Sequence, residues 1–329
     1  MQTADLVLEG GGVKGAGLAG AVEVLGRHYT FGRVAGTSAG AIVASFIAAG
    51  LTEQLEKIMV DTNFADFLDE GSVLGHLGKL GEGIEVLLHE GIYKGNSLHD
   101  WIEHTLATAP NPVRTWGDLR IPGTDETTPI EQRYRLVVVV SDISRGRMLR
   151  LPWDYPNLLG RDPDTEPVAD AVRASASIPF FFQPWHLPVE PSIADGHDKL
   201  VLTDGGMLSN YPIDLFDDND FPTFGVKLSA RLSLQQRGWH TTDGVLSLGK
   251  ALISTMMSAH DQLHVDEESV CARSVFVDTT GVNSTDFHLS EADKHGLFEK
   301  GAASATKFLK TWDFEAWKRT YAPAPPVPA

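Results

Sequence analysis

A serine at the centre of a Gly-x-Ser-x-Gly pattern is the first residue of this chain that could carry chemistry. Residues 36–40 read Gly-Thr-Ser-Ala-Gly, which places Ser38 between a strand candidate and an apolar helix candidate. A serine on a tight strand-to-helix turn projects its hydroxyl out of the sheet, where it can act as a nucleophile. The flanking Gly36 and Gly40 suit the crowded backbone of such a turn. The pattern also arises by chance, and the alternative is a turn in which Ser38 only caps the helix.

A glycine-rich run, residues 10–15, reads Gly-Gly-Gly-Val-Lys-Gly. Consecutive glycines between a strand and a helix leave backbone N–H groups open to an anion. The anion could be a nucleotide phosphate or the oxyanion of a tetrahedral acyl intermediate. A nucleotide is the weaker interpretation, because Lys14 is not followed by Ser or Thr and because Arg27 and His28 stand where a dinucleotide site needs an acid. Close packing of strand and helix is the structural alternative, with Lys14 a solvated or helix-end charge.

An aspartate at the end of a short strand candidate could serve the serine. Asp204 is followed by Gly205 and Gly206, which let the chain turn away while the carboxylate projects into a cleft. A serine nucleophile needs a proton acceptor, and Asp204 can supply it directly or through a histidine. The alternative is an ordinary Asp-Gly turn. Candidate histidines that follow the aspartate lie in no distinctive motif: His240, His260, His264, His288 and His295.

The three motifs each follow a predicted strand. Parallel sheets place their ligands at the carboxyl ends of the strands, so the motifs are expected to meet there. Alternation of strands and apolar helices predicts an α/β protein with a mainly parallel central sheet and helices on both faces. The predicted strands are Ala4–Leu8, Tyr29–Val34, Tyr134–Asp142, Arg147–Leu151 (paired back on the preceding strand), Leu200–Thr203, Phe224–Leu228 and Val275–Asp278. The predicted helices are Gly15–Leu25, Ala41–Ala49, most of Thr52–Leu106, Val168–Ser177, Val245–His264 and Ser290–Thr320.

Length and composition fit one globular domain. The 329 residues are 42% hydrophobic and 22% charged. We expect a single domain over residues 1–321, with a core at 5–212, an extension at 213–321, and a disordered Pro- and Ala-rich tail at 322–329.

Charge and cysteine content exclude several functions. The net charge of −17 disfavours nucleic acid as a partner and simple electrostatic docking on an anionic membrane. The single Cys271 allows no internal disulfide. Cys and His spacing predicts no zinc site, and the acidic run 217–220 lacks the spacing of a calcium loop. No signal peptide or membrane-spanning segment is predicted, so we expect a cytoplasmic protein.

The three motifs, in this order, resemble the patatin-like phospholipase family. Its pattern is Gly-Gly-Gly-x-[Lys/Arg]-Gly, then Gly-x-Ser-x-Gly, then Asp-Gly-[Gly/Ala], and all three elements are present here at 10–15, 36–40 and 204–206. The resemblance extends from about Asp5 to Pro212. Secondary features that agree with it are Gly91–Asn96 with Leu98 and Trp101, Ala174–Pro179 with Phe182 and Pro184, and Asn210 with Pro212.

The resemblance implies a three-layer sandwich fold and a lipid acyl hydrolase with a Ser–Asp dyad. Ser38 would be the nucleophile and Asp204 the general base, and the N–H groups of Gly10, Gly11 and Gly12 would bind the oxyanion. The remaining motif residues, Lys14, Gly15, Gly36, Gly40, Gly205 and Gly206, would support this site.

The substrate implied is a phospholipid or lysophospholipid, cleaved without metal or cofactor. The protein would then be cytoplasmic and peripheral at a membrane, with contact through apolar area. Some bacterial relatives degrade membranes as toxins or triggered effectors, so a homo-oligomer or a bound ligand could hold the activity in check. Two alternatives stay open: a small-ester or thioester hydrolase that uses the same dyad, and a nucleotide-binding regulator that uses the loop 10–15.

Overall fold

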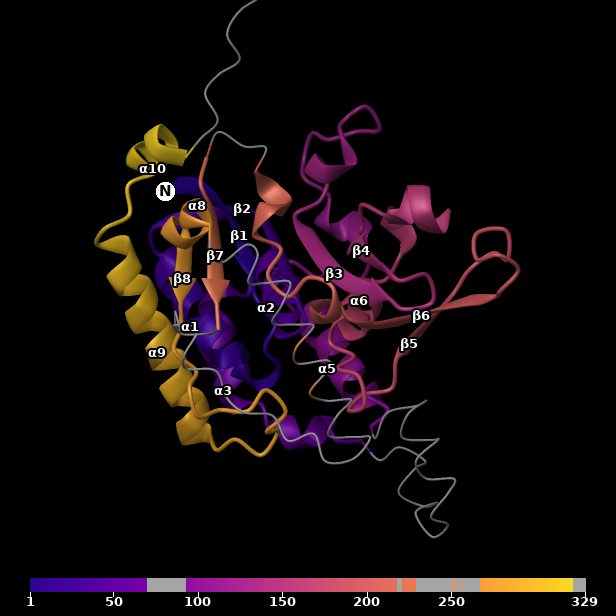
Figure 1. Ribbon diagram of the computed structural model, residues 1–329, viewed down its shortest axis with the longest axis horizontal. Helices are drawn as coiled ribbons and strands as arrows, with labels where there is room; N and C mark the ends of the chain where they lie inside the picture. Colours follow the sequence, from indigo (N-terminus) through magenta and orange to yellow (C-terminus); the bar gives the residue numbers. More distant parts are fainter. Residues whose placement is uncertain (70–92, 218–220, 229–250, 252–254, 256–266, 322–329) are drawn as a thin grey trace, which may run out of the picture.

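The computed structural model describes residues 1–69, 93–217, 221–228, 251, 255 and 267–321 (Figure 1). The strands are β1 (Gln2–Leu8), β2 (Tyr29–Thr37), β3 (Leu136–Asp142), β4 (Arg147–Leu151), β5 (Trp185–Pro188), β6 (Lys199–Asp204), β7 (Thr223–Lys227) and β8 (Ser274–Phe276). The helices are α1 (Gly15–Gly26), α2 (Ala39–Ala48), α3 (Leu55–Asp61), α5 (Asn96–Ala107), α6 (Val168–Ser175), α8 (Glu268–Ala272), α9 (Glu291–Leu309) and α10 (Phe314–Tyr321).

All of these strands belong to one sheet. Its order is β5-β6-β3-β2-β1-β7-β8, with β4 also paired to β3 (Figure 1). From β3 through β2, β1 and β7 to β8, neighbouring strands run parallel. At the other end, β4 and β6 run antiparallel to β3, and β5 runs antiparallel to β6. The predicted α/β class with a mainly parallel sheet is therefore confirmed.

The strand β3 determines where two of the predicted site residues meet. On one of its sides it pairs with β4 over residues 138–142. Its other side pairs first with β2, which ends at Thr37 opposite Val139, and then with β6, which ends at Asp204 opposite Val140. Since β2 and β6 run in opposite directions along the same side of β3, their carboxyl ends face each other. The sequence predicted a shared edge of parallel strands; the structure instead brings the two strands together head to head.

Side chains alternate between the two faces of the sheet, as a pleated strand requires. Leu6, Leu8 and Val138 face a large core that contains residues of α1, α2, α6 and α9. Val7 and its neighbours on β2 and β3 face a smaller core. Among the described residues, that second face is covered by the short turn Ile213–Phe216, by α8 and by the side chain of Trp153. The long described helices thus cover one face, and short segments cover the other.

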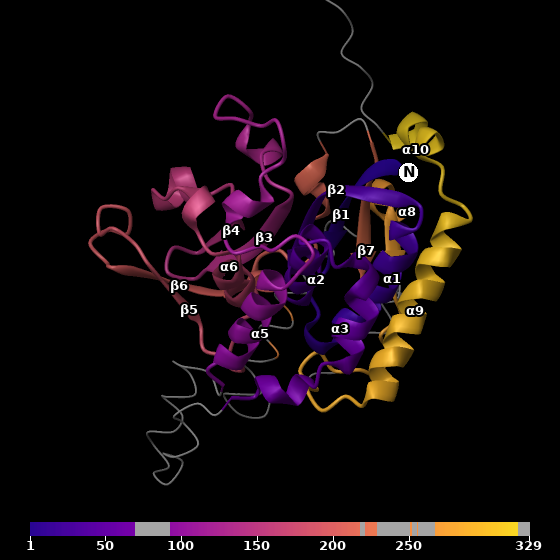
Figure 2. The same ribbon diagram turned by 180° about the vertical axis from the view of Figure 1, so that it is seen from behind.

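The segment after residue 212 completes the same sheet. It supplies β7 and β8 beside β1, and α9 runs along α1 in both views (Figures 1 and 2). The two helices approach closely at glycines: a Cβ at Gly20 would lie 2.0 Å from the Phe298 carbonyl oxygen, and one at Gly301 would lie 2.0 Å from the Gly17 carbonyl oxygen. The predicted extension is therefore part of the main core.

Several predicted boundaries change for local reasons. The predicted helix Ser290–Thr320 is two helices: α9 begins at the expected Ser290–Asp293 capping box, and α10 begins after Asp313, whose carboxylate accepts the Ala316 N–H at 2.9 Å. The helix α6 ends at Ser175, two residues earlier than predicted. The strand β5 was not predicted, because it is short and ends in a proline. Predictions for the helix Val245–His264, except residues 251 and 255, and for the tail 322–329 lie outside the described residues.

The glycine contact between α1 and α9 gives the first prediction. In Gly20→Ala the new methyl group meets the backbone of Phe298, so we expect the free energy of unfolding to fall by about 1–3 kcal/mol. The matched control is Gly296→Ala on α9, where a Cβ meets nothing within 4 Å. There the better helix propensity of alanine should raise stability by about 0.5–1 kcal/mol. Urea unfolding measures both, and equal stability of the two variants would contradict the proposed close packing.

Candidate active site

The backbone of Ser38 is strained. Its φ of 53° and ψ of −124° lie in a region that residues other than glycine rarely adopt. The turn is also crowded, because a Cβ at Gly36 would lie 2.3 Å from the backbone of Gly40, and one at Gly40 would lie 2.3 Å from the Leu8 carbonyl oxygen. The two glycines are therefore required by space. The structure confirms a sharp strand-to-helix turn, since β2 ends at Thr37 and α2 begins at Ala39.

Asp204 comes close to Ser38 because β2 and β6 end head to head on β3. Both residues are buried, with 2% and 1% of their surfaces exposed. The Asp204 Oδ1 atom accepts the Gly206 N–H at 2.8 Å. The Oδ2 atom has no hydrogen-bond partner among the described residues. A Cβ at Gly205 would lie 2.2 Å from the Val139 carbonyl oxygen, so the Asp-Gly-Gly turn also needs its first glycine.

The carboxylate of Asp204 differs from the other buried carboxylates. Burial raises its pKa to about 6, against a smaller lowering by the nearby Ser38 side chain and the Gly206 N–H. In the part of the chain that the structure describes, each other buried carboxylate is ion-paired with an arginine or a lysine. The pairs are Asp5–Arg33, Glu9–Lys227, Asp142–Arg145, Asp154–Arg150 and Glu166–Arg161. Asp204 has Ser38 beside it instead of a cation.

The glycine-rich loop follows β1 and lies beside Ser38. A Cβ at Gly10 would lie 3.2 Å from the Ser38 Cβ and 2.2 Å from the Asn210 Oδ1. The Gly10 N–H donates to the Asn210 carbonyl at 3.1 Å, so this amide is already occupied. The N–H groups of Gly11 and Gly12 donate to no described residue. Of the three predicted oxyanion donors, Gly11 and Gly12 are thus the two whose N–H groups have no described partner.

Other contacts of residues 12–15 hold the loop against the surrounding structure. Gly12 adopts a φ of +57° and lies against the backbone of Ser284, whose carbonyl accepts the Val13 N–H at 3.0 Å. Gly15 packs against Met59, since a Cβ there would lie 2.8 Å from the Met59 Cε. Lys14 is half-buried, and burial lowers the pKa of its amine. It is thus less solvated than the sequence suggested.

An apolar pocket opens at Ser38. Its empty volume is about 470 Å³, part of it open to solvent. Ser38 is the one side chain with a hydroxyl among the described residues of its wall. The remaining walls come from the two motif loops, α2, α3, α5 and the segments around 178 and 287: Gly12, Val13, Ala39, Ile42, Met59, Phe64, Phe67, Leu98, Trp101, Ala176, Ile178, Phe182 and Phe287.

Neither of the two candidate histidines that the structure describes is buried beside Asp204. His288 is exposed, and His295 is an exposed side chain that pairs with Glu56 and Glu299. His240, His260 and His264 lie outside the described residues.

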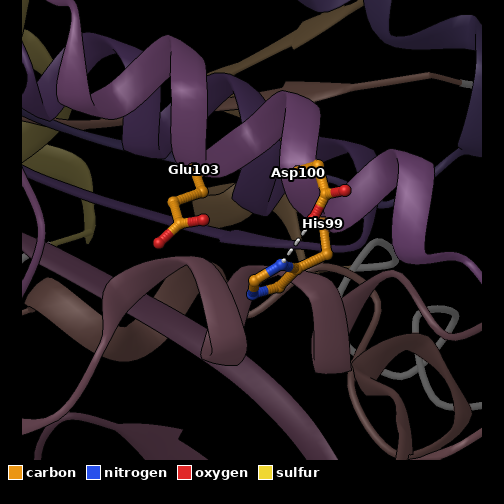
Figure 3. A group of neighbouring side chains, drawn as sticks. All are labelled: His99, Asp100 and Glu103. Atoms are coloured by element: carbon orange, nitrogen blue, oxygen red, sulfur yellow. Dashed lines mark ion pairs between the residues drawn. The ribbon is translucent and has the colours of Figure 1, made fainter.

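One group of potential metal ligands lies on α5. His99, Asp100 and Glu103 hold their ligand atoms within 4.8 Å of one another (Figure 3). Both His99 nitrogens already face carboxylates, Nδ1 at 3.5 Å from Asp100 and Nε2 at 2.9 Å from Asp170, and these partners raise the pKa of the imidazole. The group is thus explained by ion pairing. In the acidic run 217–220, Asp217 pairs with Arg273 and the other three residues lie outside the described part.

A serine on a strained strand-to-helix turn, next to a buried carboxylate and an apolar pocket, is characteristic of serine hydrolases. The family model described as patatin-like phospholipase matches residues 6–217. The chain therefore belongs to the patatin-like phospholipase family, and this membership supports a lipid acyl hydrolase activity.

Relatives and solved structures agree with this assignment. The uncharacterized protein YqhO of Bacillus subtilis is 36% identical over 316 residues, which cover 94% of this chain and 99% of the relative. The protein R571 of Acanthamoeba polyphaga mimivirus is 25% identical, with 92% of each chain covered. The crystal structure of VipD from Legionella pneumophila matches with a TM-score of 0.54 at 18% identity, over 94% of this chain and 67% of that one, and confirms the fold. Among the described residues, no helix is both long and apolar enough to span a membrane.

The unpaired Asp204 gives a prediction about stability. An unfolded chain ionises this carboxyl with a pKa near 3.8, whereas the folded protein ionises it near 6. The folded state therefore holds a proton that the unfolded state has lost, and stability falls as the pH rises from about 4 to about 6. Asp204→Asn cannot ionise, so at pH 8 it should be about 2–3 kcal/mol more stable than the wild type and at pH 4 nearly equal to it.

Denaturant unfolding at both pH values measures this difference. The matched control is Asp142→Asn, which removes the charge of a fully buried carboxylate that bonds the Arg145 Nε at 2.6 Å. Breaking that pair should destabilise the protein at pH 8. A loss of stability in Asp204→Asn at pH 8 would show that the Asp204 carboxylate is better stabilised than its surroundings indicate.

Proposed function

We propose that this protein is a serine acyl hydrolase that releases fatty acids from phospholipids or lysophospholipids. One observation carries the proposal: Ser38, next to the unpaired Asp204, forms part of the wall of an otherwise apolar pocket. Large exposed hydrophobic side chains are few in the described residues, namely Met1 and Ile143. The pocket is thus the place where the described residues can accept an acyl chain, and it brings the ester carbon to the serine.

The mechanism needs only groups of this chain and water. The Ser38 Oγ attacks the ester carbonyl carbon, and Asp204 takes the hydroxyl proton. The N–H groups of Gly11 and Gly12 bind the oxyanion of the tetrahedral intermediate. The C–O bond to the leaving alcohol then breaks, and Asp204 returns the proton to that alcohol. A water molecule, deprotonated by Asp204, attacks the acyl-serine; the fatty acid leaves, and the proton returns to the Ser38 Oγ.

The raised pKa of Asp204 suits this role. An ordinary carboxylate is a weak base toward a serine hydroxyl, because its pKa is far below that of the hydroxyl. Burial brings the pKa of Asp204 to about 6, so the group is a stronger base and is still ionised at neutral pH.

The two alternative functions, a small-ester or thioester hydrolase and a nucleotide-binding regulator, require different groups at the site. A small-ester or thioester hydrolase would use the same Ser38 and Asp204, so only the length of the preferred acyl chain separates it from a phospholipase. A nucleotide-binding regulator would need polar side chains in the pocket wall as well as the N–H groups of the glycine loop. The described pocket wall next to Gly12 and Val13 is apolar instead, and it favours an acyl chain over a phosphate.

The dyad predicts the outcome of a lipid assay. Wild-type protein should release fatty acid from mixed phospholipid vesicles in the presence of EDTA. Ser38→Ala and Asp204→Asn should each lower the rate by about 10³-fold or more, because each removes a group that acts in the transition state. A fluorophosphonate probe should label Ser38 in the wild type.

Two outcomes of this assay would favour a function other than phospholipid hydrolysis. Labelling of Ser38 without release from vesicles, but with hydrolysis of short-chain esters or thioesters, would favour the small-ester alternative. Neither release nor labelling would contradict a hydrolase and direct attention to the glycine loop as a ligand site.

The pH dependence follows from the same carboxyl group. Asp204 must be ionised to accept the proton, so kcat/KM should rise about tenfold per pH unit below pH 6 and level off above it. Hydrolysis of a soluble ester between pH 4.5 and 8.5 measures this profile. A rate that does not change across this range would rule out Asp204 as the titrating base.

A further inference from the structure

The C-terminal end of α6 contacts the backbones of both Ser38 and Asp204. The Ser175 hydroxyl accepts the Ser38 N–H at 2.9 Å and donates to the Val139 carbonyl at 2.7 Å. Two residues later, the Ser177 carbonyl accepts the Asp204 N–H at 2.9 Å. One short segment therefore bonds to both members of the dyad, which are 166 residues apart in the sequence (204 − 38).

The Ser175 hydroxyl lies at the point where β2 leaves the sheet. It bridges an N–H of the chain leaving β2 and a carbonyl of β3, and Ser175 itself is fully buried. Without this hydroxyl the Ser38 N–H would be buried and unpaired, which would lower the stability of the turn. Because Ser38 holds a strained φ of 53°, a hydrogen bond to its own N–H opposes relaxation of the turn at the residue where relaxation would move the nucleophile.

The segment is itself held in place by a buried arginine. Arg173 donates to the carbonyls of Gly95 and Lys94, each at 2.8 Å, and to the Ser177 Oγ at 2.5 Å. Only 2% of its surface is exposed. These bonds tie the end of α6 to the start of α5, the helix that supplies Leu98 and Trp101 to the pocket.

We propose that Ser175 is a positioning residue, whose hydroxyl holds Ser38 in its strained conformation and at its working distance from Asp204. The inference rests on the proposed function. Ser175 does not touch the reacting atoms; it acts through the backbone of the nucleophile. Its loss should therefore slow the chemical step and leave the apolar pocket, and with it substrate binding, largely unchanged.

The test compares Ser175→Ala with the matched control Ser45→Ala. Ser45 is also fully buried and bonds a backbone carbonyl, that of Ile42 at 2.7 Å, but it contacts neither member of the dyad. With a soluble ester, Ser175→Ala should lower kcat by about 10- to 100-fold with KM within about threefold of wild type. Ser45→Ala should keep kcat within about twofold. Rates are divided by the folded fraction, measured by circular dichroism in the same buffer.

A second variant distinguishes the effect of losing the hydroxyl from the effect of changing the packing at residue 175. Ser175→Thr keeps a hydroxyl on the same carbon and should recover most of the kcat lost in Ser175→Ala. The rate at which a fluorophosphonate labels Ser38 should follow kcat across the variants, since the probe reports the nucleophile without lipid binding.

The outcomes separate this inference from the proposed function. An active wild type with Ser175→Ala as fast as Ser45→Ala, or Ser175→Thr as slow as Ser175→Ala, overturns the positioning role alone. A wild type that neither hydrolyses the ester nor labels overturns the proposed function and the positioning role together.

Discussion

Two strands that end head to head on one side of β3 impose the constraint on which the rest of the site depends. Because Asp204 already pairs with Val140, the chain of β2 cannot continue past Thr37 and must leave the sheet within one residue. That residue is Ser38, and its positive φ is the consequence. The crowding that makes Gly36, Gly40 and Gly205 necessary comes from the same junction. Ser38 and Asp204 thus meet because β2 and β6 both end at neighbouring residues of β3.

The electrostatics of the core distinguish this junction from the rest of the described protein. Elsewhere among the described residues, a buried carboxylate has an arginine or lysine beside it, as in Asp5–Arg33. Asp204 has one amide and a serine hydroxyl, so its ionised form is poorly compensated and its pKa is raised. A cation at this position would stabilise the folded protein and would also weaken the base. In the proposed function, the site gives up stability for a stronger base, as active sites often do.

The motifs singled out Ser38 and Asp204, which the fold brings together, because residue types and their spacing are local properties of the sequence. The strands before Gly10, Ser38 and Asp204 were also predictable, since short apolar runs before glycines are local patterns too. The antiparallel direction of β6 was not, because alternation of side chains is the same in either direction. Ser175 and Asn210 were noted only as features of a resemblance. Their roles come from contacts across 137 residues to Ser38 and 200 residues to Gly10, which no local pattern contains.

The motif-bearing region does not make the site alone. The family match ends at residue 217, but the sheet continues through β7 and β8, and α9 packs on α1 at close range. The segment before α9 reaches the site itself. The Ser284 carbonyl accepts the Val13 N–H beside the glycine loop. The Phe287 ring stacks on Phe181, with the ring centroids 4.7 Å apart, and lines the pocket. The motifs thus supply Ser38 and Asp204, whereas one wall of the pocket comes from a part of the chain that carries none of the motifs. In the proposed function, substitutions in this wall would change acyl-chain selectivity and leave Ser38, Asp204 and their strands as they are.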